Sequence, residues 1–218
     1  MKRRLLQPEP RTRFFRTILV LEVGLGVLSL GIGWLIGYDE IGEIISRLST
    51  PRLVSGDLFW GAIAALPMFA LAWSVERSRL GSLRFLRFVV RKLVRDLFLE
   101  FSTWQIALVS LAAGVSEEMF FRGILFDAIC EKLDISLVVW GLMLASSLLF
   151  GLAHAITRAY LVLATLIGIY LALVLMLFDN LLVPMVTHAL YDFVLLKYFL
   201  WRLGQQRRNG LNERLFSL

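Results

Sequence analysis

The stretch ISLVVWGLMLASSLLFGLAHAI, residues 135–156, contains no lysine, arginine, aspartate or glutamate. A helix needs about 20 consecutive, mostly apolar residues to cross the hydrocarbon core of a bilayer, and this stretch is long enough. Similar stretches precede and follow it, at about 17–38, 57–75, 103–129, 158–178 and 180–201. The sequence therefore predicts an all-α, polytopic integral membrane protein with about six membrane-spanning helices.

The composition of the whole chain supports this prediction. Of its 218 residues 58% are hydrophobic and 18% are charged, whereas soluble domains are closer to half apolar and about a quarter charged. The length fits a single membrane domain, 1–218, in which 1–100 holds the first spans and a basic segment, 101–203 the core helices and 204–218 a cytoplasmic tail. A single cysteine, Cys130, excludes an intramolecular disulfide framework.

The positive charges predict the orientation in the membrane. The net charge is +6, but lysine and arginine flank the apolar stretches, which indicates membrane orientation and not nucleic-acid binding. Six basic residues precede the first span, seven lie in 76–100 and five follow residue 196, while the other loops hold two, one and none. The pattern predicts that both termini are cytoplasmic. The short chain is typical of a prokaryotic protein, so we expect it in the plasma membrane of a prokaryote.

The basic segment has its own helical pattern. Arg84, Arg87, Arg91 and Arg95 recur between apolar residues at helical spacing. This predicts an amphipathic helix that lies on the inner leaflet and is attracted to anionic headgroups. The alternative is an ordinary basic loop.

A few ionisable side chains lie inside the predicted spans, where each costs about 2.5–3.5 kcal/mol at the centre of a helix. They concentrate in the spans at 103–129, 135–156 and 180–201, and those on which the site prediction rests are Glu117, Glu118, Arg122, His154, His188 and Asp192. Two pairs have i, i+4 spacing, so Glu118 can pair with Arg122 and His188 shares a face with Asp192. An isolated pair can be a packing clamp, and an isolated histidine an interhelical hydrogen bonder. The combination on three helices favours a functional site.

The motifs of several intramembrane proteases are missing. The chain has no GxSG, no HExxH, no GxGD and no lysine deep in a span. Serine, site-2-type metalloprotease and presenilin-type mechanisms are therefore not indicated. Two possibilities remain: water activated by a carboxylate, or a metal held by the same residues.

Three motifs carry a family resemblance. EEMFFR (117–122), FGLAH (150–154) and HALYD (188–192) resemble, in order, the EExxxR, FxxxH and HxxxN/D motifs of the CAAX-protease and bacteriocin-processing family. These intramembrane glutamic proteases include the Rce1-type CAAX endopeptidases and the prokaryotic Abi proteins. The resemblance implies an endopeptidase without a metal or other cofactor.

The resemblance also implies residue roles. Glu117 would activate the attacking water with His154, Glu118 and Arg122 would brace the helix, and His188 and Asp192 would stabilise the oxyanion. Asp192 stands where Rce1-type enzymes carry asparagine, and an ionised aspartate cannot donate to an oxyanion. We expect it to accept a hydrogen bond from His188, which leaves the division of labour between these two residues open.

The predicted function is hydrolysis of membrane-associated peptides or small membrane proteins in a cavity open to the cytoplasm. One alternative is a metal-dependent hydrolase with Glu117, His154, His188 and Asp192 as ligands. Another is a non-catalytic membrane scaffold or immunity protein. Counted from the cytoplasmic ends of their spans at about 1.5 Å per residue, the ionisable residues are predicted to lie at depths that differ by more than ~10 Å. A tilt, or a break near Gly114, is needed to bring them together.

Overall fold

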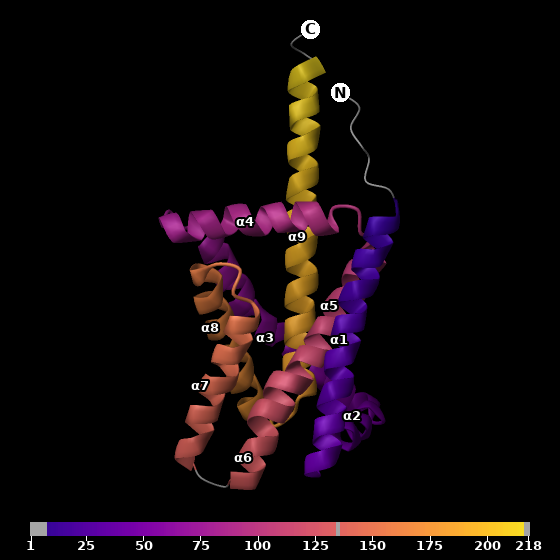
Figure 1. Cartoon of the computed structure of the whole chain (residues 1–218), viewed down its shortest axis with the longest axis vertical. Coiled ribbons are helices and arrows are strands. Elements are labelled where there is room, and N and C mark those ends of the chain that lie inside the picture. Colours follow the sequence, from indigo (N-terminus) through magenta and orange to yellow (C-terminus); the bar gives the residue numbers. More distant parts are fainter. Residues whose placement is uncertain (1–7, 134–135, 216–218) are drawn as a thin grey trace.

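The computed structural model describes residues 8–133 and 136–215, which form a bundle of helices without any strand (Figure 1). Each predicted span coincides with helical structure. The elements are α1 (Pro8–Ile36), α3 (Pro51–Arg77), α5 (Thr103–Glu118) continued by η1 (Met119–Asp127) and α6 (Ala128–Leu133), α7 (Ser136–Ala153), α8 (Arg158–Phe178) and α9 (Leu182–Leu215). The short α2 (Glu40–Leu48) lies between α1 and α3. The predicted all-α membrane bundle is confirmed.

The number of spans fits the prediction only roughly. Among the described residues, four helices are long and apolar enough to cross a membrane, namely α1, α3, α8 and α9. A fifth candidate span is counted when α4 (Gly81–Phe98) and the helix that follows it are taken together, although the chain bends by 118° between them. The apolar part of α7, Val138–Ala153, is shorter, and residue 135, where its span was predicted to begin, lies outside the described residues.

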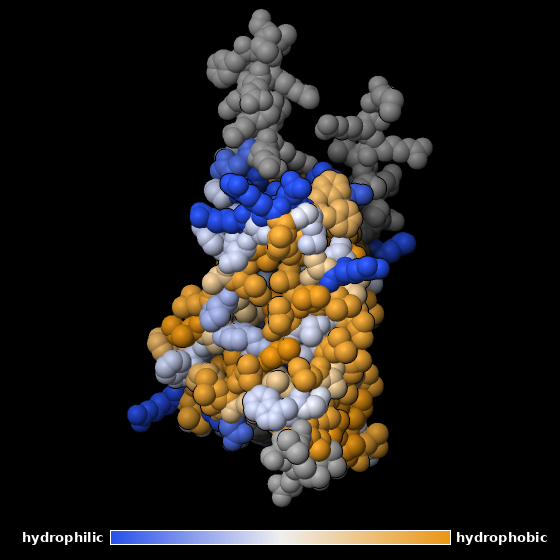
Figure 2. All heavy atoms as spheres, turned by 90° about the vertical axis from the view of Figure 1, so that its left-hand side faces the viewer, coloured by the Kyte–Doolittle hydropathy of each residue, from blue (hydrophilic) through white to orange (hydrophobic). Residues whose placement is uncertain are grey.

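The helix predicted in the basic segment is present and lies across one end of the bundle. Figure 1 shows α4 crossing the long helices at the level of the first turns of α1, with the later turns of α9 continuing beyond it. Leu86 and Val94 of α4 are buried against the bundle. Figure 2 shows an apolar surface over the body of the bundle and hydrophilic side chains gathered toward this end.

The described part of the predicted tail is helical. Helix α9 continues through Leu215 without a break at residue 204. The basic residues Lys2, Arg3 and Arg4 of the predicted N-terminal cluster lie outside the described residues, as do residues 216–218.

A close crossing of α5 and α9 brings distant parts of the chain to the same depth. A Cβ atom on Gly114 would lie 2.6 Å from the backbone nitrogen of Ala189, so only glycine permits this approach. Of the two possibilities raised by the predicted depths, a tilt or a break near Gly114, the break is not formed, because α5 is continuous from Thr103 to Glu118. The crossing itself places Glu117, one turn after Gly114, beside His188 of α9.

Candidate active site

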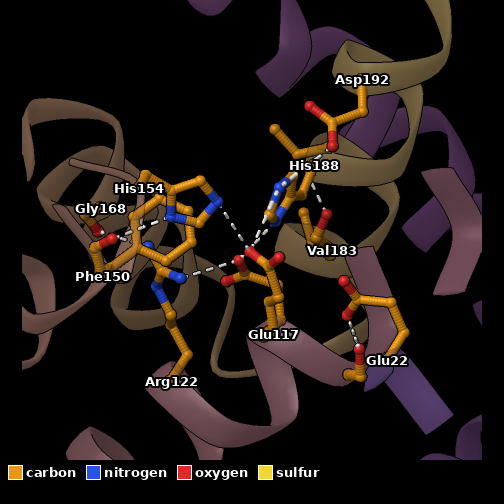
Figure 3. Close-up of polar contacts among 12 residues, drawn as sticks. Glu22, Glu117, Arg122, Phe150, His154, Gly168, Val183, His188 and Asp192 are labelled. Carbon is orange, nitrogen blue, oxygen red and sulfur yellow. Dashed lines mark hydrogen bonds and ion pairs between the residues drawn. The ribbon is translucent and has the colours of Figure 1, made fainter. Parts of the chain in front are cut away.

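The four residues predicted to be catalytic come together from three parts of the bundle (Figure 3). Glu117 lies near the C-terminal end of α5, and His154 directly follows the last residue of α7. His188 and Asp192 lie on successive turns of α9. The juxtaposition that the sequence could only suggest is therefore present in the fold.

Glu117 lies between two imidazole rings. Its Oε2 atom is 3.6 Å from Nε2 of His154 and 4.0 Å from Nε2 of His188. Only 13% of the Glu117 side chain is exposed, and Oε2 has no hydrogen-bond partner among the described residues. Both distances are longer than a direct hydrogen bond, and groups at this separation can be bridged by one small molecule such as water.

The second glutamate has a different environment. Oε1 of Glu118 accepts hydrogen bonds from Nη1 of Arg122 at 2.9 Å and from Nδ1 of His188 at 2.8 Å. Nη2 of Arg122 also donates to the carbonyl oxygen of Gly168 in α8, at 3.1 Å. Glu118 and Arg122 are both fully buried. The predicted Glu118–Arg122 pair is therefore formed, and it also holds His188.

The hydrogen bonds of the two histidines aim the same ring atom at Glu117. Nδ1 of His188 is bound to the Glu118 carboxylate, and Nδ1 of His154 is 2.9 Å from the carbonyl oxygen of Phe150. A nitrogen that faces a carboxylate or carbonyl oxygen carries the proton. In both rings Nε2 is the atom left to face the Glu117 carboxylate.

Phe150 packs in the middle of the cluster. Its ring centroid is 4.4 Å from that of His154 and 5.8 Å from that of His188, and the Arg122 guanidinium lies 4.4 Å from the ring centroid. One aromatic ring therefore contacts two histidines and forms a cation–π contact with the buried arginine. This packing gives a structural reason for the phenylalanine of the FGLAH motif.

Asp192 does not form the hydrogen bond expected from the sequence. Its Oδ2 atom is 3.6 Å from Nε2 of His188, which is beyond hydrogen-bond distance. The other ring nitrogen of His188 is bound to Glu118 instead. The Asp192 side chain is one-third exposed, so it lies at the rim of the cluster and not at its centre.

A cavity of about 160 Å³ connects the cluster to the end of the bundle that carries α4. His154, His188 and Asp192 line one part of it. The remaining walls are mostly apolar and come from α3, α4, α8 and the later turns of α9, including Leu71, Leu86, Val90, Leu163 and Leu195. Access to the ionisable cluster is therefore from the α4 side.

One ionisable residue beside the site was missed by the sequence analysis, which assigned no site residue in 1–100. Glu22 of α1 accepts a hydrogen bond from the hydroxyl of Ser116, at 2.7 Å, and Ser116 directly precedes Glu117 (Figure 3). A carboxylate within the apolar stretch 17–38 was the available signal, because the energetic argument applied to Glu117 applies equally to Glu22.

Within residues 8–133 and 136–215, no group of three or more histidine, cysteine, aspartate or glutamate side chains has an arrangement that could hold a metal ion.

Comparison with known proteins gives one family match. Residues 99–194 match the family described as type II CAAX prenyl endopeptidase, Rce1-like. The matched range contains all three motifs, from Glu117 to Asp192, in agreement with the resemblance inferred from them. No curated protein and no solved structure matches the chain.

Proposed function

Because residues 99–194 match the Rce1-like family of type II CAAX prenyl endopeptidases, we propose that this chain hydrolyses peptide bonds with a water molecule activated by Glu117. The observation that carries the proposal is the position of the Glu117 carboxylate, with Nε2 of His154 at 3.6 Å and Nε2 of His188 at 4.0 Å. A carboxylate and an imidazole at this separation can both bind the attacking water.

Each group then has a distinct task. Glu117 removes a proton from water while His154 orients it, and the oxygen attacks the carbonyl carbon of the substrate. His188, whose Nδ1 donates to Glu118, donates from Nε2 to the developing oxyanion as an imidazolium. Such a donor in a site that excludes water is worth about 2.7–4 kcal/mol. Glu117 passes its proton to the leaving nitrogen as the carbon–nitrogen bond breaks.

Asp192 supports His188 electrostatically in this scheme. At 3.6 Å its carboxylate stabilises a positive charge on the imidazole without a direct hydrogen bond. Glu118 does the same from the other side of the ring and also fixes the ring orientation. The oxyanion donor is therefore His188, and Asp192 is a positioning residue.

The lining of the cavity supports a proposal about the class of substrate. Its apolar walls lead from the α4 end of the bundle to the ionisable cluster, which suits an apolar peptide segment that reaches the site from the membrane surface. We propose membrane-associated peptides or small membrane proteins as substrates, cleaved on the cytoplasmic side.

The cytoplasmic position of α4 can be tested by cysteine labelling. Ser82 lies in the first turn of α4 and Ser49 follows α2, and both residues are exposed. After replacement of Cys130 by alanine, we expect Ser82→Cys to react with a membrane-impermeant thiol reagent only in opened cells, and Ser49→Cys in intact cells. The opposite labelling would reverse the orientation and place the cavity on the outer side.

A metal-dependent mechanism makes a different prediction from the carboxylate mechanism. We expect protein purified without a histidine tag to contain well under one equivalent of transition metal, measured by elemental analysis. Hydrolysis should survive prolonged treatment with a membrane-permeable chelator, because Glu117 and the histidines activate water directly. Stoichiometric metal that is lost and restored together with activity would establish the metal-dependent alternative.

A further inference from the structure

A second hollow lies on α4, outside the active-site cavity. It has a volume of about 330 Å³. Five of its seven lining side chains are basic: the lining residues are Arg84, Arg87, Phe88, Arg91, Lys92, Arg95 and, from α9, Leu203. We call this hollow the α4 groove. Such a concentration of positive charge requires an explanation beyond the folding of the helix.

Two of the arginines attach α4 to the end of α3. Arg87 donates through Nη1 to the carbonyl oxygens of Val75 and Ser78, and Arg91 pairs with Glu76. The bonds of Arg87 satisfy carbonyl groups at the C-terminal end of α3, and together with the Arg91–Glu76 pair they fix α4 across the bundle. Both residues therefore have a structural role in addition to lining the groove.

The remaining cations are less occupied. Arg95 pairs with its exposed neighbour Asp96 at 3.0 Å. Arg84 and Lys92 have no ion pair and no side-chain hydrogen bond in the part of the chain that the structure describes. They lie two turns apart along the helix, and Phe88, which is 66% exposed, lies between them. The groove thus offers two unpaired cations and an apolar ring side by side.

The orientation of α4 indicates what this surface meets. The helix turns by 118° relative to the segment that follows it, so it lies along the end of the membrane-spanning bundle. Phe85 is also exposed, at 59%, next to the cationic face. A helix that presents arginine, lysine and exposed phenylalanine at this level is suited to the headgroup region of a bilayer.

We propose that the α4 groove binds the phosphate of an anionic phospholipid, with Arg84 and Lys92 as its ligands and Phe88 against its glycerol and upper acyl region. A phosphate group complements the two unpaired cations, and the exposed phenylalanine favours a lipid over a free anion. The opposite side of α4 lines the active-site cavity through Leu86 and Val90, so the bound lipid would hold one wall of that cavity in place. The site does not depend on the proposed catalytic mechanism.

The test uses the purified full-length chain in a neutral detergent, titrated with a short-chain phosphatidylglycerol and followed by thermal unfolding or intrinsic fluorescence. We expect saturable binding of this lipid, and no saturable binding of a short-chain phosphatidylcholine or of inorganic phosphate. In the double variant Arg84→Gln/Lys92→Gln the apparent affinity should fall about 30-fold, as expected when two cations near an anionic group are lost.

A charge-matched control separates the groove from net charge. Arg52 and Arg79 are exposed basic residues that do not line the groove. The double variant Arg52→Gln/Arg79→Gln should bind phosphatidylglycerol as tightly as the unaltered chain. Equal loss in both double variants, no loss in either, or equally tight binding of inorganic phosphate would each overturn the assignment of a phospholipid site.

Discussion

Replacing Glu117 by glutamine is expected to abolish peptide hydrolysis while leaving the protein folded. The amide cannot remove a proton from water, and loss of a general base lowers the rate by about 10²- to 10⁴-fold. The change keeps the shape of the side chain and removes a carboxylate of which only 13% is exposed. Thermal unfolding should therefore occur at an unchanged or a higher temperature.

The measurement can be made before any substrate has been identified. Purified protein is added to native membranes, and new peptide termini are identified by mass spectrometry. Glu131→Gln provides the matched control, because Glu131 is an exposed glutamate of α6 outside the site. It should yield the same termini as the unaltered chain, whereas Glu117→Gln should yield none of them.

Two other outcomes would contradict the proposed role of Glu117, and the first of them would support the scaffold alternative. If Glu117→Gln unfolds the protein, the carboxylate is structural. If it leaves both folding and cleavage intact, Glu117 is not the base. Under the proposed mechanism, the inactive variant also binds substrates without releasing products, so a pull-down with it from native membranes should identify them.

The parts of this site that could be predicted from sequence are local. The pairing of Glu118 with Arg122 follows from i, i+4 spacing on one helix, and the same spacing places His188 and Asp192 on one face of α9. The existence of the spans follows from the length of the apolar runs. The amphipathic pattern likewise predicted that the basic segment would be a helix.

What the sequence could not supply is the way the helices cross. The bond between Glu118 and His188 joins residues 70 positions apart and depends on the contact between Gly114 and Ala189. Periodicity reports which face of a helix is apolar, but not how closely or at what angle two helices meet. For this reason the sequence predicted different membrane depths for the ionisable residues of the site. The crossing of the helices brings these residues together without a break at Gly114.

The change of helix type after Glu118 was also outside the reach of the sequence. Residues Met119–Asp127 form a π-helix, in which the backbone hydrogen bonds span one more residue than in an α-helix. No residue in EEMFFRGIL signals this change. The π-helix begins at the residue after Glu118 and includes Arg122. The guanidinium of Arg122 packs against the ring of Phe150 and donates a hydrogen bond to the carbonyl oxygen of Gly168. π-Helical segments are rare in proteins as a whole, but those that occur are often found at functional sites.

The largest expected effect on stability comes from breaking the buried pair. Arg122→Met removes the positive charge beside Glu118 and leaves a fully buried carboxylate with His188 as its only hydrogen-bond partner among the described residues. Removing one member of a buried ion pair costs about 3–5 kcal/mol, because the remaining charge loses its compensation. We expect Arg122→Met to lower the unfolding temperature strongly, and Glu118→Gln to do the same by stranding the guanidinium.

The double variant Glu118→Gln/Arg122→Met distinguishes a charge effect from general damage to packing. It removes both charges, so it should be less destabilised than the sum of the two single variants, as measured by thermal or denaturant unfolding in detergent. Arg122→Lys retains the charge but presents one ammonium in place of two separate donors to Glu118 and Gly168, so its stability should be intermediate. Strictly additive losses in the double variant would show that Arg122 stabilises the bundle by filling space, and not by compensating the charge that holds His188 in position.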